Sequence, residues 1–400
     1  MKVRILRLDN FGRGIAYYND KICFICNAFP NELVDFKIVK ETSKYIEGES
    51  INIIEKSSDR LESKCKFSKM CGGCCFQEYD YSLENKYKED KLKDLVERNL
   101  NISSKIVNDI VFDNDIFYRN KLILHGDSNF LGLYKNKTND VIDVDECIIS
   151  NKRINKIITL LRKVKNIDEV LIRTSNDEKQ VIIDIKGNID NYDFLLDCCD
   201  VLIINGEVVS SDNRIITNIG DKKYYLSSDS FFQVNEFLID KMFNRVLEYV
   251  KELKPVNVLD LYCGTGSFGV YIADYAESIV GVDYNSSNIK DAIDNMRLNN
   301  ISNIEYICDK VENVIDRFNN YDLVIVDPPR AGLDKKSCQY LIDMNPKNII
   351  YISCDPNTLM RDLKILGNIY SIKEITPYNL FPKTYHVETV SVLCHKTIEK

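Results

Sequence analysis

The sequence lacks any apolar run near the roughly 18–20 residues that a membrane-spanning helix needs. Its first residues, 1–7, have neither the long apolar stretch nor the small-residue cleavage site of a signal peptide. Only three histidines are present, His125, His386 and His395, and their wide spacing argues against a histidine-based zinc site. Internal repeats and low-complexity tracts are also missing. These absences predict a cytoplasmic protein without a membrane partner.

What the chain does contain is an unusual number of thiols. Fourteen cysteines in a reducing compartment indicate metal binding, catalysis or buried side chains rather than disulfides. A length of 400 residues exceeds one ordinary core, so we expect two or three domains, in a monomer. The net charge of −8 argues only weakly against a nucleic-acid partner, because local basic patches matter more than the total.

The hydrophobic patterning divides the chain into three regions and predicts a multidomain fold. Residues 1–56 hold short strand-like runs separated by regular turn signals, which indicates a small β-barrel. Residues 57–225 read as a central α/β domain, with an irregular cysteine-bearing start and a helix at about 82–99 capped by Ser82. From 226 to 400 strands and helices alternate, which is typical of an open and mainly parallel sheet.

Individual elements can be placed within the second and third regions. The central strands are expected at 121–124, 170–173 and 180–185. In the last region we expect strands at 257–261, 278–283, 321–327 and 348–353, and helices at 267–276 and 286–299.

A glycine-rich turn follows the first strand of the last region. Its sequence, DLYCGTGSFG over 260–269, permits a tight turn and the close approach of a ligand to the backbone. Asp283 ends the next strand, where a carboxylate can bind both hydroxyls of a ribose. Such turns serve NAD enzymes and methyltransferases alike, and a glycine turn without a ligand is the plain alternative. The segment DPPR at 327–330 favours a methyltransferase, since nucleotide methyltransferases place a D/N-P-P segment beside the target base.

A candidate nucleophile, Cys354, follows the predicted strand 348–353. Open α/β sheets place their sites at this end of the strands. Asp355 is expected to cap the next helix and Pro356 to begin it. The helix N-terminus favours a thiolate at Cys354 and the charge of Asp355 opposes it, so the net effect stays open. A lone cysteine after a strand is more often buried structure.

These motifs together resemble the RNA uracil-C5 methyltransferases, most closely the iron–sulfur-containing 23S ribosomal RNA branch. The segments FQVN at 232–235, DLYCGTG, DPPR, SCDP and HVE at 386–388 follow the family's order through nearly the whole chain. The opening FGRGIA and NAFPNE resemble a TRAM domain, the family's OB-like RNA-binding barrel. Its usual proline-glycine-glutamate turn reads Pro30-Asn31-Glu32 here, and asparagine tolerates the positive φ that the turn requires.

The resemblance implies a Rossmann-like class I methyltransferase fold for 226–400 and a set of site residues. The residues that it places at S-adenosylmethionine are Gln233, Tyr262, Asp283 and Asp327, with Ser267 as a further candidate. Phe232 either stacks on a base or belongs to the core. Cys354 would be the nucleophile and Glu388 the base, with His386 as an alternative base and a solvated charge as the plain alternative for Glu388.

The chemistry of the target explains why a cysteine and a base are needed. C5 of uracil is too poor a nucleophile to attack a sulfonium methyl group unaided. Addition of a thiolate to C6 makes C5 electron-rich, and a base must afterwards remove the C5 proton so that the thiolate can leave.

A cysteine cluster lies in the irregular segment between the first two regions. Cys65, Cys71 and Cys74 follow the pattern C-x5-C-x2-C on a loop with glycines, which can bind a cluster or a zinc ion. By resemblance, Cys147 supplies the fourth thiolate of a [4Fe–4S] cluster, with structural zinc as the rival. Cys75 departs from the family's usual polar residue and could be a spare thiol or a confusing ligand.

A second close pair of cysteines, Cys23 and Cys26, has C-x2-C spacing but lies in a strand-like run. We interpret both as packing residues.

The sequence therefore predicts a methyltransferase that acts on a uracil of RNA, most specifically 23S ribosomal RNA. Three rivals remain. A transfer-RNA uracil methyltransferase would usually lack the barrel and the cluster. An NAD-linked oxidoreductase does not suit the DPPR and SCDP segments, and a non-enzymatic RNA-binding iron–sulfur protein would not need Cys354 and Glu388.

Overall fold

The computed structural model describes residues 1–127 and 130–396. It contains a six-stranded sheet, a seven-stranded sheet, a two-stranded hairpin and a second seven-stranded sheet, in chain order. The predicted regions 57–225 and 226–400 include positions 128–129 and 397–400, which lie outside the described residues. Within the described residues, no helix is long and apolar enough to cross a membrane.

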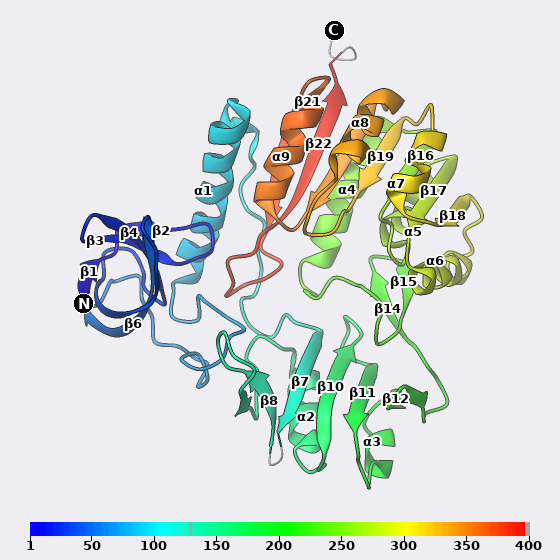
Figure 1. Cartoon of the computed structure of the whole chain (residues 1–400). Helices are drawn as coiled ribbons and strands as arrows, with labels where there is room; N and C mark the ends of the chain where they lie inside the picture. Colours follow the sequence, from blue (N-terminus) through cyan, green and yellow to red (C-terminus); the bar gives the residue numbers. More distant parts are fainter. Residues whose placement is uncertain (128–129, 397–400) are drawn as a thin grey trace.

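The N-terminal sheet curls into a barrel-like shape (Figure 1). Its strands, in the order β1-β5-β6-β4-β3-β2, are β1 (Lys2–Arg4), β5 (Leu33–Glu41), β6 (Tyr45–Glu55), β4 (Lys21–Cys26), β3 (Gly14–Tyr18) and β2 (Arg7–Leu8). The two edge strands, β1 and β2, are joined by only two residues, and the Leu6 amide of this link donates to the Ile15 carbonyl at 2.8 Å. Asn31 adopts the predicted positive φ, 69°. Cys23 is fully buried in the barrel core and Cys26 is half-buried on the same strand, β4.

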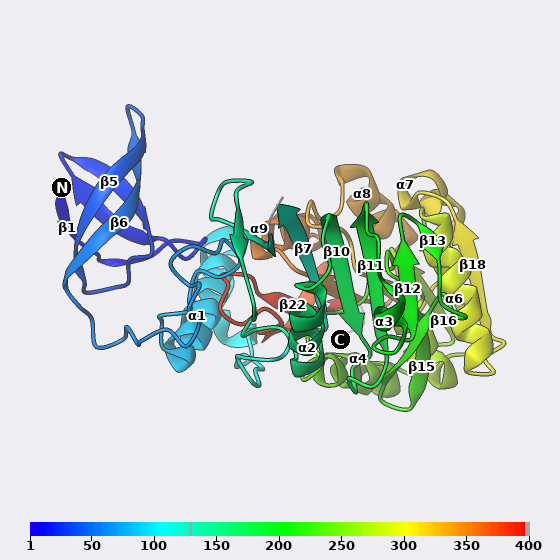
Figure 2. The same cartoon turned by 90° about the horizontal axis from the view of Figure 1, so that it is seen from below.

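The first long helix, α1 (Tyr81–Leu100), begins one residue earlier than predicted. Its cap is Asp80 rather than Ser82, because the Asp80 carboxylate accepts from the backbone amides of Ser82 and Leu83 at 2.9 and 3.2 Å. The helix buries Leu92 and Val96 against the C-terminal sheet. It lies between the barrel and the rest of the molecule in both views (Figures 1 and 2).

The central sheet has the order β13-β12-β11-β10-β7-β8-β9. Its strands are β7 (Lys121–Asp127), β8 (Phe130–Tyr134), β9 (Val141–Asp143), β10 (Ile167–Thr174), β11 (Val181–Gly187), β12 (Val201–Ile204) and β13 (Glu207–Val208). The helices α2 (Lys152–Leu161) and α3 (Asp193–Leu196) belong to this region. The three predicted strands correspond to β7, β10 and β11, and a hairpin of β14 (Ile215–Ile219) and β15 (Lys222–Leu226) leads to the next sheet.

The C-terminal sheet has the order β18-β17-β16-β19-β20-β22-β21. Its strands are β16 (Asn257–Leu261), β17 (Ser278–Asp283), β18 (Ile304–Cys308), β19 (Leu323–Val326), β20 (Asn348–Ser353), β21 (Tyr370–Tyr378) and β22 (Glu388–His395). The first five are parallel, while β22 runs antiparallel to β20 and β21. The four predicted strands and both predicted helices are present, and the parallel sheet confirms the expected Rossmann-like fold.

Helices cover both faces of this sheet. They are α4 (Ile239–Leu253), α5 (Ser267–Ile272), α6 (Ser286–Leu298), α7 (Val311–Val314), α8 (Lys335–Met344) and α9 (Pro356–Leu366). Alternate strand residues serve the two faces, as Val258 packs in one core cluster with α4 and Leu259 in the other with α8 and α9. Because β16, β17, β19 and β20 are parallel, their carboxyl ends meet at one edge of the sheet, where α/β folds hold their sites.

Candidate active site

The glycine-rich turn after β16 has the backbone that its sequence predicts. Gly264 and Gly266 have φ of 54° and 74°, and Tyr262 also has a positive φ, 62°. The Gly264 amide donates to a carboxylate oxygen of Asp283 at 3.1 Å. A Cβ at Gly264 would meet no atom of the described residues within 4 Å, so open space adjoins the turn.

Asp283 lies at the end of β17 beside this space. Its other carboxylate oxygen accepts from the Asn285 amide at 2.9 Å and from the Asn288 side chain at 3.2 Å. Three donors thus fix the carboxylate against the turn. A polyhydroxy ligand entering there would meet an oriented acceptor, which fits a ribose.

Tyr262 and Gln233 are held by different parts of the molecule. The Tyr262 hydroxyl donates to Glu312 at 2.9 Å, which holds the ring beside the turn. Gln233 is buried, and the Asn120 side chain donates to its backbone carbonyl at 3.3 Å. Asn120 immediately precedes β7, so the central sheet fixes the segment that bears Gln233.

Phe232 and Ser267, two further candidates for the site, have different surroundings. Phe232 is buried in the core with its ring 5.9 Å from that of Tyr224, which confirms the core reading of this aromatic. Ser267 starts α5, and its hydroxyl lies 3.1 Å from that of Thr265. The serine therefore faces back into the glycine turn.

Asp327 follows β19 as predicted. Its backbone amide donates to the Leu261 carbonyl at 3.3 Å, which joins it to the end of β16. Burial raises the pKa of the Asp327 carboxyl to about 7. Its charge acts on both Cys354 and Glu388, so the DPPR segment and the candidate nucleophile share one site.

The pairing of β20 with β22 brings Cys354 and Glu388 together. Ser353 and Thr389 are partners in this antiparallel pair. Cys354 directly follows Ser353, and Glu388 directly precedes Thr389. Cys354 is half-buried and Glu388 is buried. Asp355 caps α9 and Pro356 begins it, as the sequence predicted.

The electrostatics of the thiol, left open by the sequence, are set by its surroundings. Burial, together with the charges of Glu388 and Asp327, raises the pKa of Cys354 to about 12, although Arg330 opposes the rise. The helix N-terminus alone does not decide the ionisation. A thiolate at this position depends on positive charge, which Arg330 supplies.

The two candidate bases differ in the same environment. Burial raises the pKa of Glu388 well above its usual range, with Asp327 adding to the rise. Burial and the charges of Arg330 and two lysines lower the pKa of His386 to about 4. Because a higher pKa makes a stronger base, burial and charge favour Glu388 over His386.

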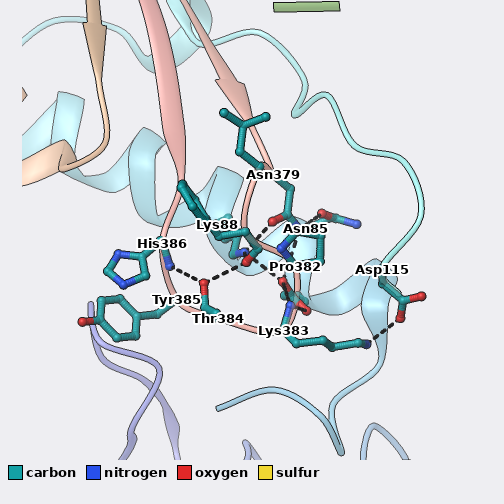
Figure 3. A network of polar contacts seen from close by, with 12 residues as sticks. Asn85, Lys88, Asp115, Asn379, Pro382, Lys383, Thr384, Tyr385 and His386 are labelled. Atoms are coloured by element: carbon teal, nitrogen blue, oxygen red, sulfur yellow. Dashed lines mark hydrogen bonds and ion pairs between the residues drawn. The ribbon is translucent and has the colours of Figure 1, made fainter. Parts of the chain in front are cut away.

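A buried polar network holds the loop 379–387, which connects β21 to β22 and carries His386 (Figure 3). Lys88 of α1 is fully buried, and its ammonium donates to Glu84 at 2.8 Å, to the Asn379 side chain at 2.6 Å and to the Phe381 carbonyl at 3.1 Å. The Lys383 amide donates to Glu84 at 3.0 Å. The loop before Glu388 is thereby fixed on α1.

Two acidic residues of this edge were missed by the sequence interpretation. Asp260, within β16, is buried, and one of its carboxylate oxygens has no hydrogen-bond partner among the described residues. Burial raises its pKa to about 8. Asp309 follows β18, and its amide donates to the Asp283 carbonyl at 3.1 Å. The sequence could have indicated both, because each is an acidic residue in or just after a strand of the parallel sheet.

The four predicted metal ligands lie around one cavity. Cys65, Cys71, Cys74 and Cys147 all line a cavity of about 520 Å³ between the cysteine loop and the central sheet. The Gly73 amide donates to the Cys71 sulfur at 3.4 Å. No group of three or more His, Cys, Asp or Glu side chains in the described part of the chain is placed to hold a metal ion. The four thiols are thus gathered around one space but are not closed around a point.

Cys75 faces a different direction from its neighbour Cys74. It does not line the cavity, and its sulfur lies about 3.5 Å from where a Cβ on Gly12 of the barrel would be. Its backbone amide donates to the Lys383 carbonyl at 2.9 Å. Cys75 therefore packs between the barrel and the loop 379–387.

Comparisons of sequence place the chain among RNA-modifying enzymes. Residues 208–396 match the family tRNA (Uracil-5-)-methyltransferase. A protein of Clostridium acetobutylicum described as an uncharacterized RNA methyltransferase is 31% identical over 442 residues, covering 98% of this chain and 95% of its own. One from Staphylococcus aureus strain N315, described in the same way, is 29% identical and covers 97% of this chain and 96% of its own.

A solved structure shares the fold over the whole length. The tRNA (uracil-54, C5)-methyltransferase of Pyrococcus abyssi, in complex with S-adenosyl-L-homocysteine, superposes with a TM-score of 0.81. The match covers 98% of this chain and 100% of the other, at 24% identity. The likeness therefore includes the N-terminal barrel as well as the C-terminal sheet.

Proposed function

The chain belongs to the S-adenosylmethionine-dependent RNA uracil-5-methyltransferase family, and from this premise we propose that it methylates C5 of a uracil in 23S ribosomal RNA, with Cys354 as nucleophile. One observation carries the mechanism. The β20–β22 register sets Cys354 beside Glu388, within the electrostatic reach of Asp327. C5 methylation through a covalent adduct requires a thiol and a basic carboxylate, and the DPPR segment lies with them here.

The donor site lies at the carboxyl ends of β16, β17 and β19. Its residues in this proposal are Gln233, Tyr262, Asp283 and Asp327, with Ser267 beside them. The open space at Gly264 and the oriented Asp283 carboxylate support this placement. S-adenosylmethionine supplies an electrophilic methyl group when it is bound there.

The protein residues act on the uracil in two steps. Cys354 adds as a thiolate to C6, and the electron pair of the C5–C6 double bond moves toward O4, which makes C5 nucleophilic. Once C5 carries the methyl group, the Glu388 carboxylate takes the C5 proton. The released electrons restore the C5–C6 double bond and expel the Cys354 thiolate.

We also propose that Cys65, Cys71, Cys74 and Cys147 bind a [4Fe–4S] cluster. A single zinc ion, with Zn–S bonds of about 2.3 Å, needs sulfurs that converge on one point. Four thiols spaced around a cavity fit the wider cluster better. Methyl transfer needs no electron-transfer step, so these cysteines act in stabilising the fold or in positioning RNA.

The N-terminal barrel, in this proposal, is a TRAM-type RNA-binding domain of a monomeric cytoplasmic enzyme. Ribosomal RNA is favoured by the cysteine motif and its resemblance to the ribosomal branch. Transfer RNA is the second candidate, and two observations favour it: the name of the matching family and the whole-chain likeness to the Pyrococcus abyssi enzyme. Because that likeness includes the barrel, the barrel does not separate the two substrates.

The deciding experiment compares RNA from wild-type cells and from cells in which the gene is deleted. Ribosomal and transfer RNA are purified separately, digested, and analysed by mass spectrometry for 5-methyluridine. We expect one or more uridines of 23S ribosomal RNA to lose the methyl group on deletion and to regain it on complementation. Loss confined to transfer RNA would establish the second candidate, and no change in either RNA would refute the proposed activity.

A further inference from the structure

A loop of the barrel, residues 9–13 between β2 and β3, is rigidly attached to the rest of the molecule. Within it, the Asp9 carboxylate accepts from the amides of Phe11 and Arg13 at 2.9 and 2.7 Å. From α1, the Tyr87 hydroxyl donates to the Asp9 carbonyl at 2.7 Å and the Lys91 ammonium to the Asn10 carbonyl at 2.8 Å. The backbone on both sides of Phe11 is thus held in place.

The Phe11 side chain lies at the outer end of a row of rings that leads to the active site. Its ring is 5.7 Å from the Tyr385 ring, nearly perpendicular to it, and the Tyr385 ring is 4.2 Å from that of His386. Tyr385 and His386 project side by side from the loop 379–387 (Figure 3). His386 is two residues before Glu388, the partner strand residue beside Cys354, and Arg330 acts on both His386 and Cys354, so the inner end of the row adjoins the active site.

A second contact ties the same loop to the nucleophile. The Asn10 side chain donates to that of Asn357 at 3.5 Å. Asn357 is in the first turn of α9, three residues after Cys354. The barrel loop therefore borders the active site from two directions.

Phe11 remains 52% exposed although its backbone is fixed. An exposed aromatic ring on a fixed backbone gains little from the hydrophobic effect, but it presents a face on which a nucleic-acid base can stack. The Arg13 guanidinium lies 5.4 Å from the centre of this ring, and its ion pairs with Asp9 and Glu47, at 2.8 and 3.6 Å, hold it there.

We propose that Phe11 is a stacking platform for an unpaired base of the RNA substrate, a near neighbour of the target uridine in the strand. The inference rests on the proposed function, which requires the target uracil to leave any duplex before its C6 can meet Cys354. Nucleotides flanking such a uracil are splayed and are recognised by aromatic stacking combined with positive charge. Phe11 and Tyr385 supply the aromatic rings, and the exposed Arg330, whose charge acts on Cys354, supplies positive charge. The barrel thereby selects the RNA segment around the methylated position.

The test uses the full-length protein and a 23S ribosomal RNA transcript. Phe11→Ala should weaken binding of the transcript by about tenfold or more, measured by fluorescence anisotropy, and raise the KM for RNA in parallel. The kcat at saturating RNA and the affinity for S-adenosylhomocysteine should stay within about twofold. Phe11→Trp, which keeps a ring of larger stacking area, should bind RNA as tightly as the wild type.

A matched control is available on the same barrel. Tyr17 in β3 is 62% exposed, and none of the ring contacts described for the Phe11 row involves it. Tyr17→Ala should leave RNA binding unchanged. An equal loss in Tyr17→Ala and Phe11→Ala would point to a general effect on the barrel and would overturn the proposal, as would unchanged binding in Phe11→Ala.

Direct stacking is read with 2-aminopurine placed one or two nucleotides from the target uridine in a shorter transcript. Its fluorescence should be quenched on binding to the wild type and quenched less with Phe11→Ala. Because binding and quenching are measured without turnover, they test the stacking role of Phe11 even if the wild-type protein methylates neither RNA. That last outcome would refute the proposed function, while normal methylation with wild-type KM in Phe11→Ala would refute only the platform.

Discussion

Ser353 and Thr389 face each other across β20 and β22, and the Thr389 hydroxyl donates a 3.1 Å hydrogen bond to the Ser353 carbonyl. Cys354 follows the first of these residues and Glu388 precedes the second. Since the strands are antiparallel, both side chains leave the sheet at the same point. A covalent step and a proton-removal step can therefore be assigned to neighbouring groups and separated by mutation.

The first prediction separates these two steps. Cys354→Ala should abolish methylation, because C5 of uracil is not nucleophilic enough without the C6 adduct. Glu388→Gln should still form the adduct and accept the methyl group, but it should release the product slowly because the C5 proton is retained. A covalent protein–RNA complex should therefore accumulate and migrate slowly on a denaturing gel.

The double variant Cys354→Ala, Glu388→Gln serves as the control and should give no such band. Normal turnover by Glu388→Gln would move the base elsewhere, with His386 next to be tested. Methylation by Cys354→Ala would contradict the covalent mechanism itself.

The second prediction concerns the ionisation of the nucleophile. With its pKa raised to about 12 by burial, Cys354 should react with iodoacetamide at a rate that rises steadily from about pH 7 to 9 without a plateau. Arg330→Met removes a charge that lowers this pKa and should slow the reaction at each pH. Glu388→Gln removes a charge that raises the pKa and should speed the reaction.

Mass spectrometry of the peptide that contains Cys354 measures these rates. Cys308, which is exposed, is an internal reference in the same samples. Equal directions of change in the two variants would be inconsistent with an electrostatic origin.

The third prediction tests the donor site. Asp283→Ala removes a buried and oriented acceptor and should weaken binding of S-adenosylhomocysteine by about 1–3 kcal/mol, measured by isothermal titration calorimetry. Asp343→Ala is a suitable control because Asp343 is exposed on α8. Unchanged affinity in Asp283→Ala would remove this carboxylate from the donor site.

The fourth prediction tests the cluster. Protein purified without oxygen should contain iron and sulfide, and Cys71→Ser or Cys147→Ser should lose both. Cys75→Ser should retain them, because Cys75 is adjacent to Cys74 in sequence but does not line the cavity. Stoichiometric zinc without iron in the wild type, or equal loss in Cys75→Ser, would refute the assignment.

Local sequence patterns predicted the parts of this site that depend on neighbouring residues. Asp355 and Pro356 form the start of α9 because a carboxylate cap and a proline suit a helix N-terminus in any context. The glycine turn is equally local, since its positive φ values follow from residue type. Ser82 was the wrong cap because the helix is capped two residues earlier, at Asp80, whose carboxylate accepts from the amides of Ser82 and Leu83.

What the sequence could not show depends on tertiary contacts. The pKa of Cys354 follows from burial and from Glu388, a residue 34 positions away that only the antiparallel strand brings near. Lys88 lies in the charged run KYKEDKLKD, which is typical of a solvated helix face, yet it is fully buried. Its partners Asn379 and Phe381 come from the other end of the chain.

The last prediction concerns this buried lysine. Lys88→Met should lower the free energy of unfolding by about 3–5 kcal/mol, because Glu84 would keep its charge in the interior without a cation. The loop 379–387 would lose its two hydrogen bonds to the ammonium and should become more accessible to hydrogen exchange. Urea denaturation and exchange mass spectrometry measure the two effects.

Lys93 provides the matched control on the same helix. It pairs with Glu89 at the same i,i+4 spacing, but both side chains are partly exposed, so water can replace either partner. Lys93→Met should therefore cost no more than about 1 kcal/mol and leave the exchange of 379–387 unchanged. If the two variants were equally stable, the Lys88 network would not be what fixes this loop on α1. If Lys88→Met alone is destabilised, adding Glu84→Leu should restore part of the loss, because the unpaired charge is then removed as well.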